Sequence, residues 1–418
     1  MTWPNEPGFQ GIMKIVLATC GTRGDVQPIL TLALALKDAG HEVLLAAPPE
    51  NAAWVGRYDC PFHALGSNVE TILEGCPNAH TVKPAITFIR FVRQELKKQF
   101  SQLPSIISGA DLVLGASLAS GLRSVSESLD IPYGFIALSP QLLPSSHYPF
   151  LSAKKHDMPR WLNRLSWEMA KGIDNFNLKP LINRERRHLG LIPIHDAWSH
   201  ILGDHVIVAS DPSLGRVPPD VRQTYTQTGY FHLRQREVLD RKIEAFLSSG
   251  PPPLYAGFGS MPSQDMRAMT PLILDAARSG GHRIIISRPW ANGGRPSNDP
   301  DCCFISNTPH NLLFPHVAAV VHHGGAGTTA TAAKAGVPQI IVPHMLDQYY
   351  WANRVHQSGL GPKPIWRSRL TRRRLAKAIE ECLSDAAMRN RAKEISGLIQ
   401  ARDSLGKAVR LVESAFVL

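Results

Sequence analysis

The 418-residue sequence lacks the usual marks of metal-binding, disulfide-rich and membrane-spanning proteins. Its six cysteines include no Cys-x-x-Cys pair, so neither a zinc site nor a disulfide framework is indicated. No apolar run reaches the roughly 18 residues that a transmembrane helix needs. Residues 1–12 have no basic cluster followed by an apolar segment, unlike a secretory signal. These absences favour the reducing cytoplasm.

Acidic residues are in deficit, and the formal net charge is +11. The basic excess gathers at residues 184–187, 234–242 and 367–377. No aromatic-basic motif of a nucleic-acid reader accompanies these runs, so nucleic acid is not expected as a partner. The stretch Ile86–Lys98 mixes apolar and basic residues. It fits weak attachment to an anionic membrane or, more simply, a core helix with a basic outer face.

Strand-like runs predict two α/β domains in series. The first series comprises residues 14–19, 42–47, 112–114, 133–138 and 206–209. The second series comprises residues 254–258, 283–287, 303–306, 318–321 and 339–342. Helical stretches separate these runs, and the alternation indicates parallel sheets that are covered on both faces.

The predicted N-terminal domain spans residues 13–240, and the predicted C-terminal domain spans residues 241–395. Residues 396–418 are expected to form a C-terminal helix, for which a crossing back to the N-terminal domain is left open. The sequence Ser-Ser-Gly-Pro-Pro-Pro at 248–253 is the best candidate for a linker. Residues 142–191 have weak strand signals, so we interpret them as helices and loops inserted in the first domain.

A glycine-rich loop, His322–Thr329, follows the strand-like run at 318–321. We expect Thr328 or Thr329 to cap the helix after it, which Gly336 ends. Free backbone N–H groups at a helix N-terminus, together with the helix dipole, favour an anion such as pyrophosphate. By itself the fragment fits a simple strand-to-helix turn equally well.

The turn after the first strand carries a carboxylate, Asp25, in the sequence Gly-Thr-Arg-Gly-Asp-Val-Gln-Pro. Pro28 is expected in the first turn of the following helix, and Gly40 just past its end. Ligands bind at the carboxyl ends of the strands in an open parallel sheet, so Asp25 is expected to face a cleft. On composition alone, a helix N-cap at Asp25 is the simpler interpretation.

Together these motifs resemble the first glycosyltransferase family, and within it the sterol and antibiotic branch. The resemblance rests on the His-His-Gly-Gly-Ala-Gly-Thr-Thr loop, on Gly336–Gln339 with Asp347-Gln348 downstream, and on the turn that contains Asp25. It covers nearly the full chain, from Lys14 to about Pro364. It implies an α/β protein of the GT-B fold, with two Rossmann-like domains facing across a cleft. The nucleotide-sugar donor would lie on the C-terminal domain and the acceptor on the N-terminal domain.

The resemblance implies that Asp25 is the general base, since an Asp is thought to replace the His of plant members at this place. A carboxylate within hydrogen-bond reach can take the proton of an attacking hydroxyl. Displacement from the face opposite the nucleotide inverts the sugar configuration. Arg23 is an auxiliary candidate that could tune or pair with Asp25, and a surface contact is the alternative.

The donor site implied by the resemblance comprises Ser260, Asn307, Thr308, His310, His323, Gly324, Gly325, Gly327, Thr328, Asp347 and Gln348. His323 would contact a phosphate, the glycines and Thr328 would line the pyrophosphate, and Asp347 and Gln348 would hold sugar hydroxyls. Residues 307–310 stand where the family holds the base, and Ser260 stands on a second phosphate loop. Trp290 is an auxiliary candidate for packing near the base.

These assignments predict an enzyme that moves a hexose, glucose in the first place, from UDP-glucose or a related UDP- or TDP-sugar. The acceptor would be a hydroxyl of a hydrophobic molecule such as a sterol or polyketide, with residues 142–191 contributing specificity. No cofactor or metal is expected, because no Asp-x-Asp pair stands where an ion would bridge the phosphates. The expected location is cytoplasmic, with attachment to the inner face of the membrane left open.

Two alternatives remain from the sequence. One is a nucleotide-sugar epimerase on the same fold, which would need an acid-base set in the cleft and no acceptor channel. The other is a catalytically silent partner protein that binds a sugar nucleotide or a lipid. Such a partner should lack Asp25 or the Asp347-Gln348 pair, and both are present.

Overall fold

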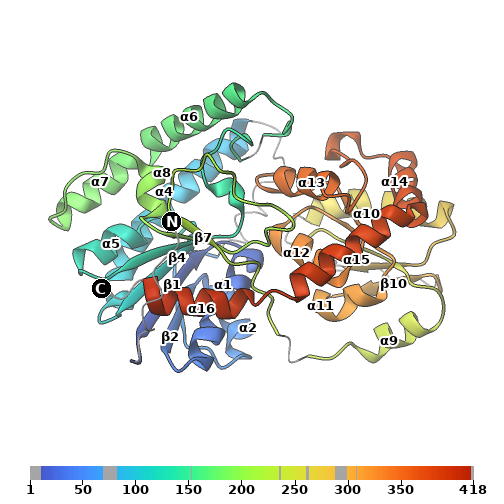
Figure 1. Ribbon diagram of the computed structural model, residues 1–418, viewed down its shortest axis with the longest axis horizontal. Coiled ribbons are helices and arrows are strands. Elements are labelled where there is room, and N and C mark those ends of the chain that lie inside the picture. Colours follow the sequence, from blue (N-terminus) through green and yellow to red (C-terminus); the bar gives the residue numbers. More distant parts are fainter. Residues whose placement is uncertain are drawn as a thin grey trace.

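The structure is a computed structural model that describes residues 11–68, 82–151, 153–234, 237–259, 263–287, 299–306 and 308–415. These residues form two parallel sheets with helices packed on both faces of each. The two α/β units lie next to each other in Figure 1. The last helix returns from the second unit to the first. Among the described residues, no helix is both long and apolar enough to cross a bilayer.

The N-terminal sheet has seven parallel strands in the order β3-β2-β1-β4-β5-β6-β7. Their bounds are β1 (Lys14–Cys20), β2 (Glu42–Ala47), β3 (Phe62–Ala64), β4 (Leu112–Ser117), β5 (Tyr133–Ala137), β6 (Val206–Val208) and β7 (Tyr225–Gln227). The helices are α1 (Arg23–Asp38), α2 (Ala52–Gly56), α4 (Val82–Ile107), α5 (Leu122–Ser128), α6 (Arg160–Asn177), α7 (Lys179–His188) and α8 (Ala197–Leu202).

Alternation along β1 explains why both faces of this sheet are covered. Ile15 and Leu17 are buried in a cluster with α1, whereas Val16 and Ala18 are buried in a cluster with α4 and α5. Successive side chains of a strand point to opposite faces, so a continuous apolar strand requires a helix layer on each side. The central strand therefore holds its carboxyl end, Cys20, at a fixed edge of the sheet.

The C-terminal sheet has five parallel strands in the order β10-β9-β8-β11-β12. Their bounds are β8 (Leu254–Gly257), β9 (Ile284–Ser287), β10 (Cys302–Ile305), β11 (Ala319–His322) and β12 (Gln339–Ile341). The helices are α9 (Arg241–Ser248), α10 (Ser263–Ser279), α11 (His310–Leu313), α12 (Ala326–Ala335), α13 (Gln348–Gln357), α14 (Arg372–Ser384) and α15 (Ala386–Gln400).

The final helix, α16 (Ser404–Ala415), packs on the N-terminal unit (Figure 1). Ala408, Leu411 and Val412 are buried in the same cluster as α1 and β1. The helix before it, α15, packs on α12 of the C-terminal unit. The chain therefore ends as a strap that joins the two units at a second place.

All ten predicted strand-like runs coincide with strands, and the structure adds β3 and β7. Each of these added strands has three residues and lies at an edge of the N-terminal sheet. Three residues offer too little alternation for a sequence pattern to identify.

Two local expectations are wrong. The 248–253 segment joins α9 to β8 within one unit, because Ile243 of α9 is buried with Tyr255 of β8. It is therefore not the linker. Phe231 and Leu233 still pack in the N-terminal core, so the chain passes between the units after Leu233. Pro28 lies in the second turn of α1 rather than in the first, because α1 begins at Arg23.

Burial decides between the two readings of Ile86–Lys98. The segment belongs to α4, where Phe91, Val92 and Leu96 are buried against residues of α7 and α8. Most of the exposed residues of the segment are basic, namely Arg90, Arg93, Lys97 and Lys98, and Thr87 and Gln94 are exposed as well. The described part of the segment is a core helix with a basic outer face, so its buried apolar side chains cannot enter a membrane.

Candidate active site

Two loops meet where the units touch. One joins β1 to α1 and carries Asp25, and the other joins β11 to α12 and carries the glycine-rich sequence. α1 contacts α12 directly. Tyr230 adds to this contact, because a Cβ on Gly327 would lie 2.7 Å from its hydroxyl. The carboxyl edges of the two sheets are thus brought to one place, as ligand binding between α/β units requires.

Three hydrogen bonds hold the half-buried Asp25 carboxylate. Ser117 Oγ donates to Asp25 Oδ1 at 2.7 Å, and the Thr22 N–H and Oγ1 donate to Oδ2 at 2.8 and 3.2 Å. Burial raises the pKa of Asp25, while these hydrogen bonds oppose the rise by favouring the carboxylate. Gly21 provides the space, since a Cβ there would overlap the carboxylate.

Asp25 is not the N-cap of α1. Thr22 is the N-cap, and Asp25 stands three residues later and reaches back to the Thr22 N–H. This is one half of a capping box, in which an acidic residue in the first turn satisfies the N-cap N–H. The carboxylate thus stabilises the helix start, and Oδ1, which accepts from Ser117, keeps a second lone pair for a ligand.

Ser117 is a site residue that the sequence analysis missed. It ends β4 and pairs in register with Cys20 at the end of β1. Its φ of 52° is rare for a residue other than glycine and costs on the order of 1–3 kcal/mol. That backbone conformation accompanies the hydrogen bond from its hydroxyl to Asp25. The only available signal was its place at the carboxyl end of the neighbouring strand.

Arg23 lies over the ring of Trp54 of α2, with its guanidinium carbon 4.7 Å from the ring centroid. A cation above an indole face is a favourable contact. Its positive charge also contributes to lowering the pKa of His310 in the other unit. Arg23 is therefore oriented by Trp54 and faces the C-terminal unit.

The glycine-rich loop leads directly into α12, which begins at Ala326 with Gly325 as its N-cap. Thr328 is already inside the helix, and Thr329 is fully buried, so the prediction that either caps it is wrong. Gly325 needs no side-chain cap. The first N–H groups of any helix lack intrahelical acceptors, so those of α12 remain available to an anion. Gly336 ends the helix with a φ of 73°, as predicted.

His322 fastens this loop to the sheet. Its buried Nδ1 accepts from the Gly324 N–H at 3.1 Å, so its Nε2 donates to Gln339 Oε1 at 3.0 Å. Burial lowers its pKa to about 3, which keeps the ring neutral. Gly324 has a φ of 89° and lies against Ile341 and the Gln348 carbonyl.

His323 lies half-buried between two glycines of neighbouring loops, Gly259 after β8 and Gly325. Burial lowers its pKa to about 4. The imidazole is therefore neutral at physiological pH and can offer a hydrogen bond but no charge to a phosphate. A charged contribution from His323 is not needed where helix N–H groups already face the anion.

Asp347 occupies the N-cap position of α13 without a side-chain capping hydrogen bond, and Gln348 is the first residue of the helix. The Trp351 Nε1 donates to Asp347 Oδ2 at 3.1 Å. Burial, with a smaller contribution from Asp25, raises the pKa of Asp347 to about 7. Gln348 Oε1 accepts from the backbone of residues 344 and 345, which leaves its amide NH₂ to donate to a ligand.

The predicted base-binding residues have contacts of their own. His310 Nε2 lies 2.8 Å from the Tyr255 hydroxyl, and its ring stacks on Phe314 at 4.6 Å. Thr308 Oγ1 donates to the Ser306 carbonyl at 2.8 Å. Three further residues predicted for the donor site fall outside the described residues: Ser260, Trp290 and Asn307.

Comparisons with known proteins identify the family. Residues 15–145 match the glycosyltransferase family 28 N-terminal domain, and residues 272–407 match the C-terminal domain of erythromycin biosynthesis protein CIII-like proteins. The vancomycin aglycone glucosyltransferase of Amycolatopsis orientalis is 35% identical over 96% of this chain and 98% of its own length. The chain therefore belongs to the glycosyltransferase family that includes this vancomycin aglycone glucosyltransferase. A sterol 3-beta-glucosyltransferase of Arabidopsis thaliana, UGT80A2, is 31% identical over 95% of this chain and 65% of its own length.

Solved structures agree on the fold of this glycosyltransferase. The kitacinnamycin glycosyltransferase superposes with a TM-score of 0.72 at 18% identity, over 97% of this chain and all of the other. Glycosyltransferase SsfS6 of Streptomyces sp. SF2575, in complex with thymidine diphosphate, gives 0.65 at 20% identity over 96% and 99%. At these identities the likeness concerns the fold alone, and it confirms the predicted GT-B architecture of two α/β domains.

Asp299-Pro300-Asp301 has the Asp-x-Asp spacing of a pair that could hold a metal ion bridging the phosphates of a donor. In this glycosyltransferase it immediately precedes β10, at the amino edge of the C-terminal sheet. Asp299 accepts from Arg278 at 2.7 and 3.0 Å. The pair therefore lies at the edge opposite the glycine-rich loop, which begins at the carboxyl end of β11.

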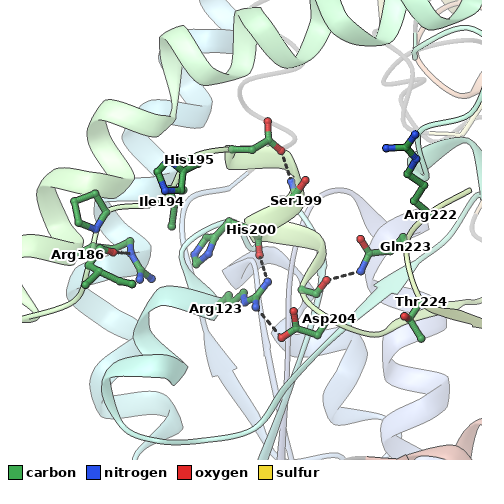
Figure 2. A pocket seen from close by; sticks show the side chains of 14 residues that line it. Arg123, Arg186, Ile194, His195, Ser199, His200, Asp204, Arg222, Gln223 and Thr224 are labelled. Carbon is green, nitrogen blue, oxygen red and sulfur yellow. Dashed lines mark hydrogen bonds and ion pairs between the residues drawn. The ribbon is translucent and has the colours of Figure 1, made fainter.

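A hollow of about 670 Å³ lies elsewhere in the glycosyltransferase, among α5, α7, α8 and the segment before β7 (Figure 2). Two of its arginines form ion pairs, Arg186 with Glu127 at 2.6 Å and Arg123 with Asp204 at 2.8 Å. None of the predicted site residues lines it. Size alone therefore does not locate the active site here.

The close packing around Gly324 generates a prediction. An alanine Cβ there would lie 2.8 Å from Ile341 Cγ2 and 3.0 Å from the Gln348 carbonyl oxygen, at a φ of 89°. Gly281 is the matched control, because it has a φ of 68° and nothing within 4 Å of its Cβ position. We expect Gly281→Ala to cost only the positive-φ strain of about 1–2 kcal/mol.

Gly324→Ala should lower the melting temperature further and should also weaken the binding of a nucleoside diphosphate, because the loop must shift. Calorimetric melting and titration with UDP and TDP measure both effects. Equal destabilisation of the two variants, with unchanged binding, would show that the loop tolerates a side chain at this place.

Proposed function

We propose that this glycosyltransferase transfers a hexose, with inversion, from a UDP- or TDP-sugar to a hydroxyl of a hydrophobic acceptor. The observation that carries the proposal is the pair of carboxylates at the domain boundary. Asp25 stands at the carboxyl edge of one sheet, and Asp347 directly precedes Gln348, whose carbonyl lies against Gly324 in the glycine-rich loop of the other. A base from one domain and a sugar-binding acid from the other are what a two-domain transferase requires.

Asp25 acts as the general base in this proposal. The hydrogen bonds from Ser117 and Thr22 fix the orientation of its carboxylate, and burial raises its proton affinity. A base is more effective when its pKa lies nearer the working pH. The acceptor oxygen attacks the anomeric carbon as its proton passes to Asp25, and the nucleoside diphosphate leaves toward the start of α12. Attack opposite the leaving group inverts the configuration.

The donor is held by the C-terminal domain. The N–H groups at the start of α12 and a neutral His323 stabilise the pyrophosphate as negative charge develops on it. Asp347 and the amide NH₂ of Gln348 hold the sugar hydroxyls. Free hydroxyls at positions 3 and 4 suit such a pair, which supports glucose over a deoxygenated sugar.

The chemistry of donor and acceptor is supported by the names of similar proteins. The vancomycin aglycone and sterol 3-beta-glucosyltransferases are both glucosyltransferases, and their acceptors are an antibiotic aglycone and a sterol. Thymidine diphosphate occupies the SsfS6 structure. We propose UDP-glucose or a related UDP- or TDP-sugar as the donor, with no metal or other cofactor resident in the protein.

We propose a cytoplasmic location with peripheral contact to anionic membrane. No disulfide joins the cysteines that the structure describes, which fits a reducing compartment. A lipid acceptor would be reached from the inner face of the membrane. Because α4 buries its apolar residues, another surface must provide that contact.

Substitution of Asp25 tests the proposed function. Asp25→Asn retains an oxygen that can accept from the Thr22 N–H, so folding and donor binding should stay close to wild type. Transfer should fall by about 10²–10⁴, the usual contribution of a positioned base. Mass spectrometry of products, with sterols and polyphenols as acceptors, measures transfer. An Asn variant that keeps more than roughly a tenth of the turnover would exclude Asp25 as the base.

Ser117→Ala tests the positioning of that base. The lost hydrogen bond favours the carboxylate, so the pKa of Asp25 should rise further. Only deprotonated Asp25 can accept the proton, so activity is lost as pH falls through this pKa. The acid limb of kcat/KM should therefore move to higher pH by on the order of one unit. Ser105→Ala, an exposed change in α4, is the control, and an unmoved limb in Ser117→Ala would contradict the proposed role.

His323 and Gln348 are predicted to serve different parts of the donor. His323→Ala should weaken the free nucleoside diphosphate and the sugar nucleotide alike, because both carry the pyrophosphate. Gln348→Ala should weaken the intact sugar nucleotide far more than the free diphosphate. Titration calorimetry with both ligands makes the comparison. Equal losses for the two ligands in Gln348→Ala would refute its assignment to the sugar.

A further inference from the structure

The outer face of α6 carries an exposed apolar stripe. Trp161, Leu165, Met169, Ile173 and Phe176 are spaced by four, four, four and three residues, so they share one face of the helix. Each is between 48% and 82% exposed. Single exposed apolar residues are common on proteins, but five in a row along one helix are not. Figure 1 shows α6 at the outer edge of the N-terminal domain.

The opposite face of α6 is anchored, which keeps the stripe pointing outward. Trp167 is buried, donates to the Tyr148 carbonyl at 3.2 Å, and meets the rings of Phe150 and Trp198 edge-on. Asn163 is also buried and donates to the Ser146 carbonyl at 2.9 Å. Rotating the stripe inward would break these contacts, so its exposure is a fixed property of the fold.

The charge around the stripe is positive. Residues 154–188 contain nine Lys or Arg and four Asp or Glu. Four of the basic residues are exposed at or before the start of α6: Lys154, Lys155, Arg160 and Arg164. Phe and Trp on one side of a helix with Lys and Arg beside them is the composition of helices that lie in the interface of an anionic membrane. A second copy of the chain would bring the same positive charge and would be repelled.

The buried side of α6 and the segment before it lie close to the boundary between the domains. The Tyr148 ring, behind α6, meets the ring of Tyr350 of α13 at 5.6 Å. Lys154 lines a small hollow together with Tyr349 and Trp366 of the C-terminal domain. A surface that binds at α6 is therefore near the helix that begins with Gln348 and near the Asp347 cap.

We propose that the outer face of α6 is a docking surface for an anionic lipid bilayer. The five apolar side chains enter the interface, and the basic residues at the start of α6 contact the lipid headgroups. This assigns a location to the membrane contact named under the proposed function, and it does not depend on the transfer reaction. An acceptor dissolved in the bilayer would then be presented next to the domain boundary.

Flotation with vesicles tests the proposal. The full chain is mixed with phosphatidylcholine–phosphatidylglycerol vesicles, or with phosphatidylcholine vesicles alone, at low and at high salt. We expect binding to the anionic vesicles, weakened by salt because the charges are exposed. The double variant Leu165→Gln/Met169→Gln should lower the partition coefficient roughly tenfold, because two apolar side chains no longer enter the interface.

Matched controls distinguish binding through this face of α6 from nonspecific adsorption to the vesicles. Leu398→Gln changes a leucine that is 49% exposed on α15, close to the 48% of Leu165, and should leave binding unchanged. Arg160→Gln/Arg164→Gln should reduce binding, whereas the same changes at the exposed Arg372 and Arg373 of α14 should not. Unchanged thermal melting and UDP binding confirm that each variant is folded with an intact donor site.

Three results would overturn the proposal. The first is the absence of salt-sensitive flotation by the wild-type chain. The second is an equal loss of binding from the Arg372 and Arg373 changes, which would indicate general electrostatic attraction. The third is a wild-type dimer in sedimentation that the Leu165→Gln/Met169→Gln variant dissolves, which would make the stripe a self-association surface. Retention of transfer in Asp25→Asn would count only against the proposed function, so the two failures are distinguishable.

Discussion

The contact between α1 and α12 is the constraint on which the candidate site depends. Each helix starts at the carboxyl edge of its own sheet, so their contact brings both edges together. Tyr230 fills the space between them: its hydroxyl lies against Gly327, and burial together with the nearby Asp25 raises its pKa. The strap formed by α15 and α16 ties the same two helices from behind, because α15 packs on α12 and α16 on α1.

Local signals in the sequence were sufficient to predict the central strands and the two loops of the candidate site. Continuous apolar runs gave every central strand, because a buried parallel strand needs apolar residues on both faces. The glycine-rich loop and the turn around Asp25 were found because glycines and a carboxylate stand directly after such runs. The family membership confirms the fold, while the individual site roles stay predictions. Capping was misjudged because Gly325 begins α12 without any side-chain bond.

The features that sequence reasoning missed depend on contacts between residues that are far apart in the chain. Ser117 reaches Asp25 across 92 positions, and no local pattern marks a serine for that contact. The spacing of the apolar residues in α6 is typical of a helix face that packs into a core. The structure instead buries Trp167 and Asn163, so the more regular apolar face is the exposed one. Which face of a helix is buried depends on its partners, and these are not encoded in its own periodicity.

The candidate site combines acidic side chains with histidines that burial keeps neutral. Close to the domain boundary lie two carboxylates, and the low pKa values of His310, His322 and His323 keep those rings neutral. Arg23, Lys154 and Arg354 bring positive charge to the boundary as well, and the chain as a whole has a net charge of +11. A pyrophosphate would therefore be drawn in by the field of the whole protein and held by N–H dipoles at the start of α12. Dipoles that hold an anion without a formal charge leave Asp25 free of a competing ion pair, which preserves its capacity to accept a proton.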